Sequence, residues 1–123
     1  MAEAGDIVHI SQRDGVTLVR LRAGAVRTEA EVEALGRGLL SVAEVPGQRV
    51  VLSFLGVKHL TSLVLGQLVQ VQKRLAESGG EIRLADIAPQ IYEVFTITHL
   101  DRLFKIYERE DEALAAFVED AEA

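Results

Sequence analysis

Hydrophobic and polar residues alternate at the beginning of the chain. Val16-Thr17-Leu18 and Val19-Arg20-Leu21 each place one polar residue between two apolar ones, and a shorter apolar run, Ile7 to Ile10, precedes them across Arg13-Asp14-Gly15. Alternation with a period of two is typical of a strand with one buried face, and Asp-Gly between two such runs is a hairpin signal. The pattern therefore predicts a β-hairpin.

The pattern changes to helical spacing after residue 28. Thr28 and Glu31 have the spacing of a capping box, in which each side chain accepts a hydrogen bond from the other residue's backbone N–H. A helix that begins there has an apolar face made of Val32, Leu35, Leu39 and Val42. Pro46-Gly47 follows the end of this helix.

The centre of the chain has the pattern of a strand, a helix and a second strand. Arg49 to Leu55 is rich in β-branched residues without alternation, which is typical of a strand covered on both faces. After Gly56 the period becomes 3.6, and Gly79-Gly80 ends the helix before the alternating run Glu81 to Ile87. The resulting βαβ unit predicts parallel strands joined by a right-handed crossover.

The central helix has an unusually wide apolar arc. Its expected buried face consists of Leu65, Leu68, Val69, Gln72, Leu75 and Ala76. Further apolar residues lie beside that face at Leu63, Val64 and Val71. Either two neighbours cover this arc inside the fold, or part of it is a docking patch.

Three more elements are expected after residue 88. Pro89 suits the first turn of a helix with Ile91, Tyr92 and Phe95 facing inward, Leu103 to Tyr107 is a short strand, and Asp111 to Glu119 is a final helix. The order β-β-α-β-α-β-α-β-α has no internal repeat or linker. It predicts one α/β domain over residues 1–123, with a mixed sheet packed against helices.

Composition and charge exclude several classes of function. The 123 residues are 49% hydrophobic and 26% charged and contain no Cys, which fits one globular domain without disulfides or thiolate chemistry. The net charge of −6 belongs entirely to the acidic segment 108–123, and a chain of this sign gains nothing from phosphate counterion release. We therefore expect no nucleic-acid partner.

A membrane span and a catalytic site are also not expected. The apolar stretch Val50 to Val71 contains Lys58 and His59 near its middle, which are costly in a lipid core. The three His lie in different elements without metal-ligand spacing, and no phosphate-binding glycine loop or nucleophile elbow is present. The sequence thus predicts no catalytic residue, no cofactor and no metal.

The segment that stands out runs from Val57 to Gly66. Thr61 and Ser62 lie between a buried strand and an apolar helix, where either can be the N-cap. A phosphate at a helix N-terminus is favoured by the free N–H groups and the macrodipole, and it adds about −1.5 to −2 charges to a docking surface. The alternative is that both residues only cap the helix.

The order of these segments resembles the STAS domain of anti-sigma-factor antagonists over nearly the whole chain. The resemblance is carried by Val50 to Phe54 with Val57, Leu60 to Gly66, Gly79-Gly80 with Ile82 to Ala85, Ala88 to Phe95, Thr98 to Asp101, Leu103 to Tyr107 and Glu112 to Phe117. It implies a STAS-like mixed sheet of four to five strands, with about four helices packed mainly on one side.

The resemblance also implies a cytoplasmic, bacterial, non-enzymatic role in partner switching. Such an antagonist docks an anti-sigma factor of the Ser/Thr kinase type, is phosphorylated by it, and is restored by a PP2C-type phosphatase. We expect the docking surface to be formed by Lys58, His59, Thr61, Ser62, Leu63, Val64 and Gln67.

The chain departs from the usual switch motif of that family, Asp-Ser-Ser/Thr-Gly-Leu-Gly. Leu63 takes the place of the phosphorylated residue, so Ser62, and after it Thr61, is the phosphorylation candidate. No Asp occurs in Ala23 to Arg27, where many members carry one near the start of the first helix. Two alternatives stay open: an unphosphorylated structural subunit of a lipid-transport ATPase or a stressosome-like scaffold, and a small enzyme or ligand binder.

Overall fold

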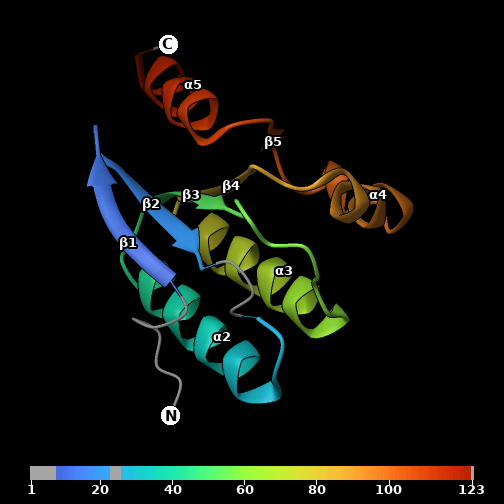
Figure 1. Cartoon of the computed structure of the whole chain (residues 1–123). Coiled ribbons are helices and arrows are strands. Elements are labelled where there is room, and N and C mark those ends of the chain that lie inside the picture. Colours follow the sequence, from blue (N-terminus) through green and yellow to red (C-terminus); the bar gives the residue numbers. More distant parts are fainter. Residues whose placement is uncertain (1–7, 23–25, 123) are drawn as a thin grey trace.

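The computed structural model describes residues 8–22 and 26–122 (Figure 1). The strands are β1 (Val8–Arg13), β2 (Val16–Leu21), β3 (Arg49–Ser53), β4 (Glu81–Ala85) and β5 (Ile106–Tyr107). The helices are α2 (Glu29–Ala43), α3 (Ser62–Glu77), α4 (Pro89–Ile97), the 3-10 helix η1 (Leu100–Arg102) and α5 (Glu110–Glu122). This is the predicted α/β class.

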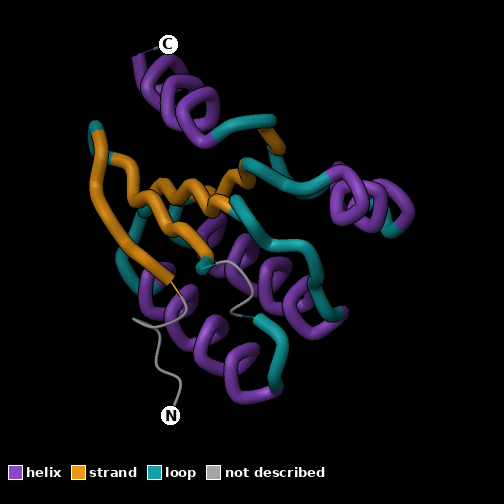
Figure 2. Tube along the Cα trace, viewed as in Figure 1, coloured by secondary structure: helices purple, strands orange, loops and turns teal. Residues whose placement is uncertain are grey.

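The five strands form one mixed sheet in the order β1-β2-β3-β4-β5 (Figure 2). β1 pairs with β2 in the antiparallel direction, and each later pair is parallel. The β1–β2 turn has Asp14 and Gly15 at φ 53° and 80°, as a two-residue hairpin requires. The hairpin prediction is confirmed, with β1 extending to Arg13 and Ile7 outside the described residues. The prediction of a single buried face is wrong for β2, because Val16 and Leu18 are buried in one apolar cluster and Val19 and Leu21 in another.

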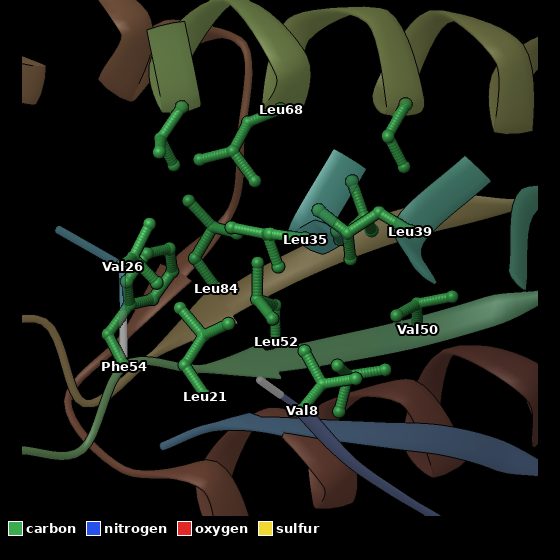
Figure 3. Packing of buried hydrophobic residues seen from close by; sticks show 14 of the residues in the cluster. Val8, Leu21, Val26, Leu35, Leu39, Val50, Leu52, Phe54, Leu68 and Leu84 are labelled. Carbon is green, nitrogen blue, oxygen red and sulfur yellow. The ribbon is translucent and has the colours of Figure 1, made fainter. Parts of the chain in front are cut away.

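Helix α2 begins with the predicted capping box. The Glu31 backbone N–H donates to Thr28 Oγ1 at 3.1 Å, and the Thr28 N–H donates to Glu31 Oε1 at 2.9 Å. Of the predicted apolar face, Val32, Leu35 and Leu39 are buried. They pack against β3 and α3 in the main core, shown in Figure 3.

The β3–α3–β4 unit has the predicted parallel connection, with Leu52 opposite Leu84. The face that α3 buries only partly matches the expected one: Leu68 and Leu75 are buried as predicted, and Val64 and Val71 are buried with them. Leu65, Val69 and Gln72 are only half-buried, and Ala76 is exposed. The sheet and α2 together cover most of the apolar arc. Val64 and Val71 are therefore buried inside the fold and do not belong to a docking patch.

The connection from α4 to β5 is less regular than predicted. Ile91 and Phe95 face the main core as expected, whereas Tyr92 is exposed. β5 contains only Ile106 and Tyr107, because Phe104 turns into the core and packs edge-to-face on Phe95, with ring centroids 6.3 Å apart. The strand expected from Leu103 is therefore two residues long.

Helix α5 covers the face of the sheet opposite to α2 and α3 (Figure 1). Its apolar residues Ala113, Leu114 and Phe117 pack on a second cluster formed by Val16, Leu18, Val51 and Ala85. The other helices contribute to the main core, so the helices do lie mainly on one side, with α5 as the exception.

Three arginines of the sheet hold α5 in place. The guanidinium of Arg83, which is 2% exposed, lies 3.9 Å from the centre of the Phe117 ring and pairs with Glu81 and Asp120. Arg49 Nη1 donates to the Phe117 carbonyl at 3.2 Å. Arg20 Nε donates to Glu110 Oε2 at 3.1 Å, and this bond lowers the pKa of the Glu110 carboxyl. The acidic segment is thus partly neutralised by the sheet.

No helix within residues 8–22 and 26–122 is long and apolar enough to cross a bilayer. The apolar stretch that raised this question is divided between the buried strand β3 and the amphipathic helix α3.

Candidate docking surface at the start of α3

The loop after β3 is fixed at its beginning by the sheet. The Phe54 backbone N–H donates to the Ala85 carbonyl at 3.0 Å, and the Val57 N–H donates to the Phe54 carbonyl at 2.9 Å. Gly56 occupies the left-handed region at φ 84°, which a residue with a Cβ rarely adopts. Phe54 and Val57 are buried and Leu60 packs against the main core, so the loop is anchored on both sides of the exposed Lys58 and His59.

Thr61, and not Ser62, is the N-cap of α3. Its backbone is extended, at φ −92° and ψ 161°, and its Oγ1 accepts from the Val64 N–H at 3.4 Å. Ser62 is the first helical residue and its side chain is exposed. Of the two predicted candidates, Thr61 is therefore the N-cap, and the Ser62 side chain is exposed in the first turn of α3.

Five of the seven predicted docking residues lie at the surface. Lys58, His59, Thr61, Ser62 and Leu63 are exposed, and Leu63 has 61% of its surface accessible. Val64 is fully buried in the main core, because it begins the stripe that α3 turns toward the sheet. Its side chain is therefore not part of any surface, and this prediction is wrong.

Gln67 has a role inside the fold that its sequence position does not reveal. It is half-buried, and its Nε2 donates to the Val32 carbonyl of α2 at 2.9 Å. Its Oε1 is buried without a hydrogen-bond partner among the described residues. A Cβ at Gly36 would lie 2.6 Å from Gln67 Nε2, so the glycine makes room for this tie between the helices.

An uncharged stripe on α3 extends the predicted site, because Gly66 and Gln70 were not among the predicted residues. Ser62, Leu63, Gly66 and Gln70 are all exposed, and α3 contains no charged residue before Lys73. A Cβ added at Gly66 would meet nothing within 4 Å. The signal in the sequence was the absence of charge on an exposed helical face, since surface helices normally carry charges there and interface centres are depleted of them.

The segment that forms this stripe has no acidic residue of its own, and Glu33 and Arg37 of α2 line the groove beside Gln70. Lys58 is exposed, and residues 54–76 include no Asp or Glu. The N-terminal turn of α3 contains no acidic side chain, so its macrodipole is not compensated there. In the described part of the chain no group of three or more His, Asp or Glu could hold a metal ion.

Comparison with known sequences assigns the fold to a family. The sequence model of the STAS domain matches residues 8–113, which is most of the chain. This chain belongs to the STAS-domain family. The predicted resemblance is confirmed. Thr61 to Gly66, where that resemblance implies the switch motif, lie at the start of α3.

Relatives of this STAS domain include proteins described as anti-sigma factor antagonists. One from Thermotoga maritima is 34% identical over 58 residues, which cover 47% of this chain and 51% of that protein. The match therefore spans about half the length of that relative. BtrV of Bordetella bronchiseptica is 29% identical over 104 residues, covering 85% of this chain and 88% of BtrV.

A solved structure shares the whole STAS architecture. It is an anti-sigma-factor antagonist (STAS) domain protein from Planctomyces limnophilus, 27% identical, with a TM-score of 0.83 over 90% of this chain and 97% of that one. The chain is thus a STAS domain similar to anti-sigma-factor antagonists in both sequence and fold.

Proposed function

We propose that this STAS domain is an anti-sigma-factor antagonist that acts by binding, without catalysis, in a cytoplasmic partner-switching pathway. The partner is an anti-sigma factor of the Ser/Thr kinase type. Its docking surface is formed by Lys58, His59, Thr61, Ser62 and Leu63, extended by Gly66 and Gln70 along α3. The observation that carries the proposal is the exposed Leu63 on an uncharged helical stripe, at the position of the family's switch motif.

The docking proposal is tested by mixing the purified chain with kinase-type anti-sigma factors encoded near its gene. A stable complex with one of them, detected by calorimetry and size-exclusion chromatography, is expected. Absence of a complex with every one of them, with and without nucleotide, would contradict the proposed function.

Gly66 provides a prediction that separates binding from stability. Alanine at this exposed helical position should raise the free energy of unfolding by about 0.5 to 1 kcal/mol, because its Cβ meets no atom and helix propensity improves. The same methyl group should lower partner affinity about tenfold, since it prevents close approach of the partner to α3. Urea denaturation and calorimetry measure the two effects.

The matched control is Glu77→Ala, an exposed substitution at the opposite end of α3. It should leave partner affinity unchanged. If Gly66→Ala binds the partner as tightly as the parent protein, α3 beyond its first turn is not part of the docking surface.

Ser62 is the proposed phosphorylation site. The Thr61 oxygen already accepts the Val64 N–H, whereas the Ser62 hydroxyl lies exposed at the first helical position, where a phosphate is stabilised by the helix N-terminus. Incubation with the kinase and ATP should add the mass of one phosphate, and a PP2C-type phosphatase should remove it. Phosphate on this stripe is expected to release the partner.

Two variants assign the phosphate. Ser62→Ala should abolish the mass shift, whereas Thr61→Asn, which keeps a capping oxygen but no hydroxyl, should retain it. An unshifted mass in the parent protein, or a shift that survives Ser62→Ala, rules out Ser62.

The second candidate function is that of a structural STAS subunit in a larger assembly, such as a lipid-transport ATPase or a stressosome-like scaffold. The observation that favours it is Leu63 at the position normally phosphorylated in the switch motif. A stable complex that forms regardless of ATP, together with an unmodified Ser62, would support this role.

A further inference from the structure

Two neighbouring hollows lie at the carboxyl ends of β3, β4 and β5. The first, of about 410 Å³, is bounded by the loop after β3, including Leu55 and Lys58, and by the start of α4. The second, of about 580 Å³, lies between α4 and β5. Ile87 and Glu108 line both hollows, so the two are adjacent, and together we call them the β5 trough.

The β5 trough follows the outer edge of the sheet. Ile106 packs against the main core and Tyr107 against the second core, so their side chains point to opposite faces. A hollow lined by both must therefore run along the strand edge and not over one face. β5 is the last strand in the sheet order and has β4 as its neighbour on one side.

The backbone of Ile106 faces this trough. The Leu84 N–H donates to the Lys105 carbonyl at 3.0 Å, which places the polar backbone groups of Lys105 toward β4. Successive residues of a strand direct these groups to alternate sides, so the N–H and C=O of Ile106 point away from β4. Such groups at a strand edge are a template for an added strand.

The lining of the trough selects the kind of segment that can lie there. Tyr92, which is 44% exposed, forms with Pro89 and Ile87 an apolar wall opposite β5. The acidic residue Glu108 lines both hollows. Asp86, whose Oδ2 accepts a hydrogen bond from Ser53 Oγ at 2.7 Å, and the cation Lys58 line the first hollow. An occupant with apolar and basic groups complements this surface.

We propose that the β5 trough binds an extended basic segment of a partner protein, which adds a strand to the edge of β5. Its backbone pairs with Ile106, an apolar side chain lies between Tyr92 and Ile106, and a Lys or Arg side chain lies at Glu108. The trough shares Lys58 with the docking surface proposed at the start of α3. Its test uses a peptide and no anti-sigma factor, so either proposal can fail without the other.

The test is an NMR titration of the isotope-labelled full chain with a short capped peptide that alternates valine and lysine. Saturable shifts are expected at the amides of Tyr92, Ile106, Tyr107 and Glu108, with a dissociation constant of roughly 1 mM or tighter. Glu108→Lys should weaken binding about tenfold or more. No saturable shift at these amides would overturn the proposal.

Two controls separate strand addition from other modes of binding. Glu119→Lys makes the same charge change at an exposed position of α5 and should leave affinity unchanged; an equal loss in both variants would mean diffuse attraction to the acidic segment. Methylation of the central peptide nitrogens should abolish binding. Unchanged binding of the methylated peptide would mean that the trough is a pocket for amphipathic amines and not a strand-addition site.

Discussion

Replacing Phe117 with alanine is expected to lower the free energy of unfolding by about 3 to 4 kcal/mol. The ring is buried between α5 and the sheet, and its loss removes a large apolar contact and the cation–π partner of Arg83. Urea denaturation measures the loss. Hydrogen exchange should show that α5 opens first, because Phe117 is the largest of its residues in the second cluster.

Phe117→Leu is the matched variant, since it retains apolar volume but not the aromatic face. It should lower the free energy of unfolding by less than half as much as Phe117→Ala does. The loss that persists in Phe117→Leu reflects the missing contact between the ring and Arg83. A loss below about 1 kcal/mol for Phe117→Ala would contradict a structural role for α5 in the domain.

Replacing Leu63 with aspartate is expected to lower the affinity for the proposed partner about 100-fold. Leu63 is the most exposed large apolar residue of α3, and a carboxylate there would be desolvated in the complex. The fold should be unaffected, because aspartate at the second position of a helix interacts favourably with the macrodipole. Calorimetry of the complex and urea denaturation of the free chain give the two quantities.

Val45→Asp is the control for this prediction. Val45 is 52% exposed after the end of α2, away from the docking surface, and the substitution makes the same change in charge. It should leave partner affinity unchanged. Equal binding of the parent chain and the Leu63→Asp variant would remove Leu63 from the docking surface.

The elements of this fold were predictable wherever their signals are local. The capping box of α2, the Asp14-Gly15 turn and the strand-helix-strand unit around α3 depend on residues close in sequence, and the structure confirms them. The buried face of α3 was misassigned because its apolar arc is wide. Periodicity alone then allows several stripes, and the sheet selects the one that joins Val64 and Val71 to the predicted Leu68 and Leu75.

The candidate site was predictable only where its signals are local in the sequence. The exposed loop and the helix start follow from the pattern, but the burial of Val64 and the tie from Gln67 to Val32 depend on how α2 packs on α3. The contacts of α5 are more remote still, since Arg20 and Glu110 are 90 positions apart. No sequence periodicity reports such pairings.

The attachment of α5 also sets where the folding unit ends. The STAS match stops at Ala113, yet Phe117 and Asp120 complete the environment of Arg83. An expression fragment cut at Ala113 would leave that guanidinium in an open sheet face beside Val16, Leu18 and Val51. Such a fragment should self-associate, so a shortened form of this domain needs to retain the chain at least through Asp120.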